Sequence, residues 1–108
     1  MEKSPKENEK STESEKNISI QLDLDDTTAQ GQYCNLTLSN FSKEEFVLDF
    51  IFLQPQFGKA KVRSRIILSP GNAKRLAKLL QESVLVYEKT HGILANDQPF
   101  PGLKLSTN

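Results

Sequence analysis

The chain has 108 residues, a mass of 12.2 kDa and a mean hydropathy of −0.51, which allows one small domain and excludes a second full core. Its 14 lysines and arginines balance its 14 aspartates and glutamates, which argues against a strongly basic chain that coats nucleic acid. The single cysteine, Cys34, excludes an intramolecular disulfide and a cysteine-based zinc site, and the single histidine, His91, excludes most histidine clusters. We therefore expect no metal, no cofactor and no enzymatic activity.

The sequence begins with charged residues from Glu2 onward and has no apolar run long enough for a signal peptide or a membrane span. We therefore expect a cytoplasmic protein. Along the chain the charges are sorted, because residues 18–58 carry a net −5 and residues 59–92 a net +6. Such sorting indicates either a basic binding face or charge pairing between neighbouring elements.

The first part of the chain changes character at Ile18. Residues 1–17 have no apolar side chain after Met1, so no packing offsets the entropy of ordering them, and we expect a disordered tail. From Ile18 to Asp25 apolar and polar residues alternate, which predicts a first strand with one buried face. A loop and a second strand over about 32–40 follow.

The third predicted strand, from Glu45 to Leu53, is the most apolar part of the chain. Phe46, Leu48, Phe50 and Phe52 share one face, and the other face is also apolar apart from Glu45 and Asp49. A strand that is apolar on both faces is covered on both faces. A helix, a tail or another subunit must therefore lie over its second side.

A fourth strand is predicted from Lys59 to Leu68, after a hairpin loop over residues 54–58 that contains proline and glycine. A hairpin centred near residue 57 places Asp49 opposite Arg65, where the two charges would pair. The same register places Val47 opposite Ile67 and Ile51 opposite Arg63, and it puts four basic residues on one face of the strand: Lys59, Lys61, Arg63 and Arg65.

A long helix is predicted next, with Ser69 as N-cap, Pro70 at its first position, an end near His91 and Gly92 as the stop signal. Its apolar stripe is wide because Leu79 and Val86 flank the central row. Residues 93–108 are expected to form an irregular tail. The predicted fold is α+β: a meander-like four-stranded antiparallel sheet followed by one long C-terminal helix, all within residues 18–92.

Four short motifs carry a family resemblance: Tyr33-Cys34-Asn35, Glu45-Phe46-Val47-Leu48-Asp49-Phe50, the helix start Ser69-Pro70-Gly71-Asn72-Ala73-Lys74-Arg75-Leu76, and Tyr87-Glu88-Lys89-Thr90-His91-Gly92. Through them the chain resembles a small bacterial and archaeal family known only as a domain of unknown function. The resemblance implies a cytoplasmic prokaryotic protein and supplies no activity. The order of strands before one long helix is also similar to SecB-type export chaperones, by topology alone.

The leading functional prediction is a non-enzymatic module that forms a homodimer and binds another macromolecule. The two-faced third strand and the wide helix stripe expose more apolar surface than four strands and one helix can cover. The predicted dimer interface consists of Val47, Ile51, Leu53, Ile67, Leu79 and Val86.

Two alternatives remain open. A nucleic-acid-binding protein would use the basic strand and the helix start, through Lys61, Arg63, Arg65, Lys74, Arg75 and Lys78. A SecB-like holdase would offer exposed apolar grooves to unfolded chains.

The single cysteine and the single histidine are each predicted to have a structural role. Cys34 falls on the apolar side of the second strand, which favours a buried structural thiol. His91 suits the C-terminal end of the helix, where a cationic imidazole interacts well with the helix dipole. The helix start at Ser69 has no glycine-rich phosphate-binding motif. We predict no catalytic residue and no metal ligand.

Overall fold

The computed structural model describes residues 17–95 and 100–106, so the disordered tail expected over residues 1–17 lies almost wholly outside the described residues. The chain divides into two compact units, Met1–Gln32 and Tyr33–Asn108. The described part of the first unit consists of an extended segment, 17–25, followed by the one-turn helix α1 (Asp26–Ala29). Asp25 caps this turn, because its carboxylate accepts a hydrogen bond from the backbone N–H of Thr28 at 3.2 Å.

The strand predicted from Ile18 to Asp25 is wrong. The segment is extended, but none of its residues pairs with a strand in the part of the chain that the structure describes. Its apolar side chains face solvent: Ile18 is 77% exposed, Ile20 82% and Leu22 92%. Alternation marks a chain suited to a sheet, but a strand forms only where another backbone supplies its hydrogen bonds.

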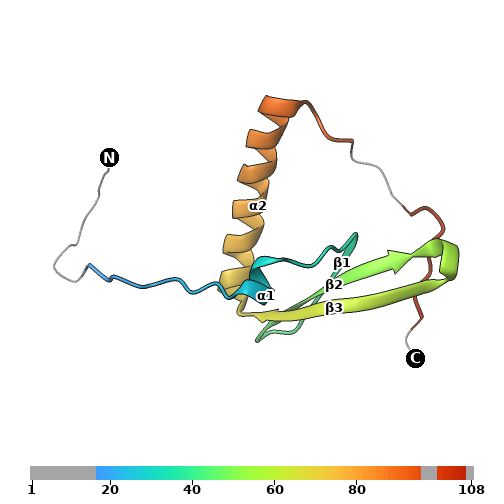
Figure 1. Ribbon diagram of the computed structural model, residues 1–108, viewed down its shortest axis with the longest axis horizontal. Helices are drawn as coiled ribbons and strands as arrows, with labels where there is room; N and C mark the ends of the chain where they lie inside the picture. Colours follow the sequence, from blue (N-terminus) through green and yellow to red (C-terminus); the bar gives the residue numbers. More distant parts are fainter. Residues whose placement is uncertain (1–16, 96–99, 107–108) are drawn as a thin grey trace. The chain divides into compact units, whose positions relative to one another are not determined.

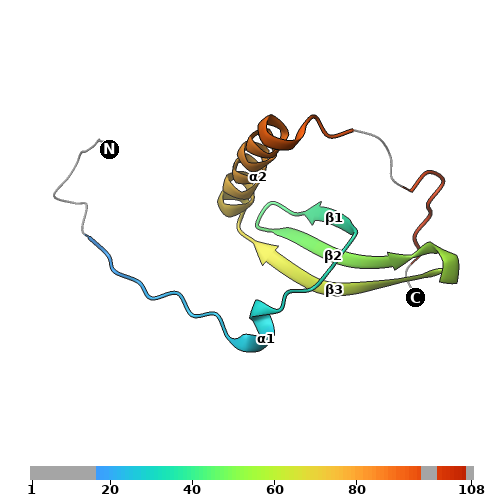
Figure 2. The ribbon, with the colours of Figure 1, turned by 45° about the horizontal axis from the view of Figure 1, so that its top comes forward.

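The second unit contains a three-stranded antiparallel sheet with strand order β1 (Leu36–Phe41), β2 (Phe46–Gln54) and β3 (Lys59–Leu68). A 3₁₀ turn, η1 (Pro55–Phe57), joins β2 to β3 and ends at Gly58, whose φ of 61° is readily adopted by glycine. The long helix α2 (Pro70–His91) follows β3 and rises from one end of the sheet (Figures 1 and 2). The architecture is therefore α+β, as expected, with three strands instead of four.

The predicted hairpin register is correct for its first half. Asp49 pairs with Arg65 and Val47 with Ile67, but Ile51 pairs with Val62 instead of Arg63. The cause is a β-bulge after Phe50, which adds one residue to β3 and shifts every later pair.

The bulge also changes which side chains share a face of the sheet. Because successive residues of a strand point to opposite faces, Lys61 opposite Phe52 lies on the other face from Arg65 opposite Asp49. The predicted single row of basic residues along β3 is therefore wrong.

The most buried part of the molecule is the second half of β2, where Ile51 is 4% and Leu53 5% exposed. The side chain of Asn35 fixes this region. Its Nδ2 donates to the carbonyl oxygen of Leu53 at 3.0 Å, and its Oδ1 accepts from the backbone N–H of Leu53 at 2.8 Å. The amide thus extends the hydrogen bonding of β2 just before β1 begins.

The helix has the predicted bounds and ends. Ser69 accepts a hydrogen bond from the backbone N–H of Asn72 at 3.2 Å, and Gly92 ends the helix at a φ of 101°. Its packing is sparse: Ala73, Leu76 and Glu88 are half-buried, and every other residue of α2 is exposed. In the described part of the C-terminal tail, residues 93–95 and 100–106, the backbone is irregular, as expected, and Phe100 and Leu103 are half-buried.

Candidate functional site

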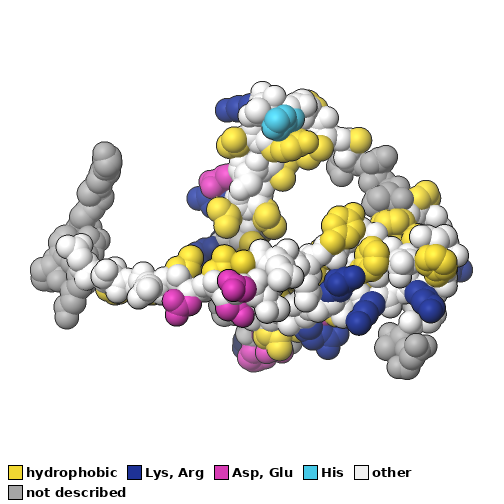
Figure 3. Space-filling view, viewed as in Figure 1, with side chains coloured by type: hydrophobic (Ala, Val, Ile, Leu, Met, Phe, Trp, Pro, Cys, Tyr) yellow, Lys and Arg dark blue, Asp and Glu magenta, His cyan; other side chains and the backbone are white. Residues whose placement is uncertain are grey.

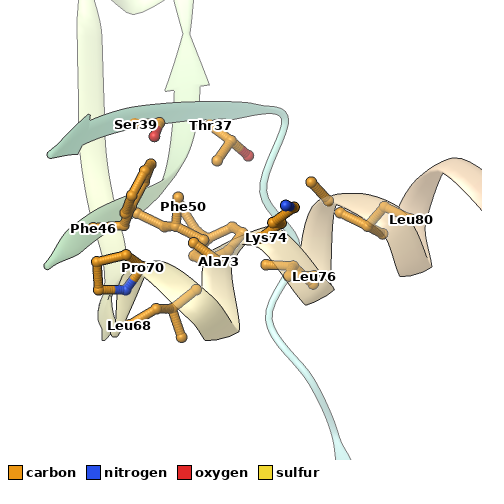
Figure 4. Close-up of a pocket in the computed structure, with 12 residues that line it drawn as sticks. Thr37, Ser39, Phe46, Phe50, Leu68, Pro70, Ala73, Lys74, Leu76 and Leu80 are labelled. Carbon is orange, nitrogen blue, oxygen red and sulfur yellow. The ribbon is translucent and has the colours of Figure 1, made fainter.

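An apolar groove lies between one face of the sheet and the first turns of α2 in the second unit (Figure 4). Its volume is about 560 Å³. We call it the sheet–helix groove, and its lining residues are Thr37, Ser39, Phe46, Leu48, Phe50, Leu68, Pro70, Ala73, Lys74, Leu76, Ala77 and Leu80.

The sheet wall of the groove follows from the period-two pattern of β2. Phe46, Leu48 and Phe50 alternate along the strand, so their side chains point to the same face. β1 contributes Thr37 and Ser39, which pair with Phe50 and Leu48 on that face. The sheet wall is therefore aromatic and aliphatic at its centre, with two hydroxyl groups at one side.

The helix wall follows from the position of α2 directly after β3. Ser69 and Pro70 start the helix at the end of the sheet, and successive turns present Ala73, Leu76 and Leu80 to the groove (Figure 4). The polar groups of the lining are two hydroxyls and the amine of Lys74, and no carboxylate or thiol is among them. This lining suits contact with apolar protein surface better than acid–base or nucleophilic chemistry.

Beyond the groove, the apolar surface continues along α2. Leu80 is 55% exposed, Val84 42% and Tyr87 47%, and these residues are spaced as one side of the helix. Figure 3 shows hydrophobic side chains along the side of α2 that faces the sheet. The groove and this helical stripe together form one continuous apolar surface. Exposed apolar residues of ordinary monomers are instead usually scattered singly.

The six residues of the predicted dimer interface have very different exposure. Ile51 and Leu53 are buried within the chain and Val47 is half-buried, so a partner would reach little of them. Ile67, Leu79 and Val86 are 58%, 59% and 64% exposed. The sequence analysis missed the sheet–helix groove, although the alternation of phenylalanines in β2 already indicated its sheet wall.

The six residues predicted to contact nucleic acid do not form one row. Arg65 lies on one face of β3 beside Asp49, whereas Lys61 lies on the other face beside Phe52. Lys74 lines the groove, and Arg75 and Lys78 are exposed on α2.

A small basic and aromatic cluster forms at the bulge instead. The guanidinium carbon of Arg63 lies 5.0 Å from the centre of the Phe52 ring, in cation–π geometry. The ring of Tyr33 meets Phe52 edge to face at 6.0 Å. Tyr33 is 69% exposed, so this cluster, Tyr33, Phe52 and Arg63, has an accessible aromatic edge.

Asp49 and Arg65 form the predicted charge pair across β2 and β3. The Arg65 Nε–Asp49 Oδ1 distance is 2.7 Å, and the Arg65 Nη2–Asp49 Oδ2 distance is 2.9 Å. These hydrogen bonds, reinforced by the charge of Arg65, lower the pKa of Asp49 and raise the pKa of Arg65. Because both carboxylate oxygens of Asp49 accept hydrogen bonds from Arg65, the pair helps to fix the register of β2 and β3.

The structure describes the surroundings of the single cysteine and the single histidine. Cys34 is half-buried, less than the full burial expected. The ring of His91 lies 4.8 Å from that of Tyr87 one turn earlier in α2. Over residues 17–95 and 100–106, no three His, Cys, Asp or Glu side chains gather as a metal site, and no helix is long and apolar enough to cross a bilayer.

Comparison with known proteins places the chain by sequence. Neither the curated proteins nor the solved structures contain a match to it. The sequence profile of a family described as a protein of unknown function (DUF3467) matches residues 1–96. The match covers most of the chain, including both the extended N-terminal segment and the sheet and helix described above. The chain therefore belongs to the DUF3467 family.

Proposed function

We propose that this protein is a non-enzymatic module that forms a homodimer through the sheet–helix groove and the apolar stripe of α2, and that the dimer binds another macromolecule. The observation that carries the proposal is the exposure of α2. A helix of 22 residues has no buried side chain of its own, although its sequence supplies a wide apolar stripe.

The physical reason lies in the cost of an unsupported helix. Helical stability in proteins comes mainly from packing of an apolar face, and isolated helices are only marginally stable in water. In the described part of the second unit, the half-buried apolar side chains of α2, Ala73 and Leu76, both lie in its first turns. A second copy would supply the missing contacts, and burying each leucine or valine would contribute about 1.5–3 kcal/mol.

A second copy also fits the chemistry of the surface. The groove lining is almost uncharged, so that the same surface on two molecules can meet without repulsion. A two-fold dimer requires such a self-complementary patch. The proposal thus explains why the apolar stripe extends past the groove to Val84 and Tyr87.

Light scattering coupled to size exclusion tests the proposal, with paired lysine variants of α2. Leu80→Lys places a charge in the stripe, and Glu82→Lys places the same residue about 200° further around the helix. Lysine is a good helix former, so both variants keep the propensity of α2. We expect the native chain and Glu82→Lys to have twice the mass of 12.2 kDa, and Leu80→Lys to shift to the monomer.

The opposite result is equally clear. A native chain that stays at 12.2 kDa at high concentration would remove the dimer, whatever the variants do. A native dimer that persists with Leu80→Lys would keep self-association but place it elsewhere on the surface.

Nucleic-acid binding is the second candidate, and one observation favours it. The cluster of Tyr33, Phe52 and Arg63 combines an exposed aromatic edge with a guanidinium, and Lys61 lies beside it in the sheet. Base stacking on aromatic rings beside basic residues is typical of single-strand binding. Because Arg63 already occupies one side of the Phe52 ring, Tyr33 is the more accessible ring of the cluster.

Fluorescence anisotropy with labelled single-stranded DNA and RNA tests this candidate at two salt concentrations. We expect binding that weakens with salt and is lost in Tyr33→Ala, while Tyr87→Ala on α2 leaves it unchanged. No binding at low salt would exclude this function. A holdase would instead require the groove to stay open in the assembled protein and to slow aggregation of an unfolded substrate.

A further inference from the structure

We propose that the extended segment Ile18–Asp25 of one copy adds as an antiparallel strand to the free edge of β3 in a second copy. The inference deepens the proposed function, because it rests on self-association and names the segment and the edge that take part. It concerns a strand given to another molecule, since within the described residues the segment pairs with none of the three strands of its own sheet.

The donor segment has the backbone of a strand without a partner. Residues 17–25 form neither helix nor strand and run as a stretched segment in Figure 1, and the backbone hydrogen bonds of the described part of the first unit are confined to the α1 turn and Gly31. Four alternating apolar residues of this segment are 65–92% exposed, namely Ile18, Ile20, Leu22 and Leu24. Such a segment gains both hydrogen bonds and apolar burial by joining a sheet edge.

The acceptor is an edge strand with the opposite charge. The sheet order leaves β1 and β3 as edges, and the first half of β3 is exposed. Residues 18–26 contain three aspartates and no lysine or arginine, whereas β3 contains two lysines, two arginines and no acidic residue. β1 has no charged residue at all. Charge complementarity therefore selects β3 over β1.

One antiparallel register satisfies charge and apolar pattern together where residues 22–25 lie opposite residues 59–62, the part of β3 before the bulge. Placing Asp23 opposite Lys61 puts Asp25 opposite Lys59, which gives two pairs of opposite charge. The intervening positions then bring Leu22 to Val62 and Leu24 to Ala60, on the face that already holds Ile51 and Leu53. A shift by one residue in either direction would set Asp23 against Val62 or Ala60 instead of Lys61.

Disulfide trapping between two singly substituted chains tests the register. Asp23→Cys and Lys61→Cys are made separately in full-length chains that carry Cys34→Ser, and the two are mixed under mild oxidation. Residues opposite each other on antiparallel strands have Cβ atoms about 4.5–5.5 Å apart, near the span of a disulfide. We expect a 23–61 link between chains, identified by mass spectrometry, and little link when Ala60→Cys, on the other face, replaces Lys61→Cys.

Charge exchange tests the same register without a covalent bond. Asp23→Lys alone should weaken the dimer by up to about fivefold, and Asp23→Lys mixed with Lys61→Asp chains should recover that loss.

Each outcome separates strand exchange from self-association. A dimer by light scattering without the 23–61 link overturns strand exchange and leaves the proposed function standing. A monomer without the link overturns both. A chain that carries both cysteines and closes the link within one molecule also overturns the proposal, because the segment would then serve its own sheet.

Discussion

The central strand β2 and the helix α2 both carry apolar rows of side chains but reach very different degrees of burial. β2 has a neighbour on each side, a side-chain clamp from Asn35 and the two buried residues Ile51 and Leu53. α2 has sound ends at Ser69 and Gly92, but its middle and last turns expose Val84, Leu85 and Val86.

The difference shows which parts of the fold the single chain completes by itself. A hairpin strand finds its hydrogen bonds within a few residues of sequence, so β2 is satisfied locally. A long amphipathic helix needs an opposing surface of similar length, and β2 and its neighbours reach only its first turns. The sheet thus forms a core within the single chain, whereas most of the apolar stripe of α2 stays exposed.

The largest effect on stability is expected in the buried second half of β2. Ile51→Ala removes a side chain that is 4% exposed and should lower the free energy of unfolding by about 2–5 kcal/mol. Leu38→Ala is the control, because its side chain is 43% exposed and leaves a smaller cavity. Urea unfolding followed by circular dichroism measures both, and equal losses would contradict the placement of the core.

The clamp from Asn35 should have the next largest effect. Asn35→Ala leaves the N–H and carbonyl of Leu53 without their side-chain partners, and we expect a loss of about 1–3 kcal/mol in the same measurement. Asn40→Ala, at an exposed position of β1, is the matched control and should change stability little. Indistinguishable variants would mean that water replaces the clamp without cost.

The N-cap of α2 should contribute less. Ser69→Ala removes the acceptor of the Asn72 N–H and should cost about 1 kcal/mol, together with some helical signal. Ser83→Ala, an exposed position within the helix, should preserve or slightly raise helicity. If the two serine variants behave alike, the cap does not set the start of α2.

The smallest effect is expected at the Asp49–Arg65 pair, because Arg65 is 63% exposed. The lowered pKa of Asp49 means that the stabilisation is present above the usual carboxyl range, about pH 4, and is lost as pH falls through the folded-state pKa. Thermal unfolding should therefore show Asp49→Asn below the native chain at pH 6, with the gap closing in acid and in high salt. A gap that widens in acid would contradict the pairing.

The sequence predicted the elements whose signals are local. Ser69, Pro70 and Gly92 set the ends of α2, and the lengths of β3 and of the hairpin loop placed Asp49 opposite Arg65. The bulge at Arg63 was not predictable, because period-two alternation in β3 continues through it without a break. Nor was the clamp by Asn35, since it depends on the backbone of a strand 18 residues away.

The prediction of a strand from Ile18 to Asp25 was wrong for a different reason. Its alternation is as regular as that of a true strand, but pattern specifies only the side chains and not the partner backbone. Helical spacing already placed Leu76 and Leu80 in the central row of the stripe, but the sequence does not show that the sheet and the helix leave a groove between them.

Hydrogen exchange at two protein concentrations measures most directly whether α2 depends on a second copy. Amides of β2 should keep their protection at both concentrations, because their partners belong to the same chain. Amides in the second half of α2, residues 80–91, should lose protection on dilution below the dimer dissociation constant. Protection of α2 that is unchanged in a sample whose mass remains 12.2 kDa would show that the helix is stable alone and would contradict the dimer.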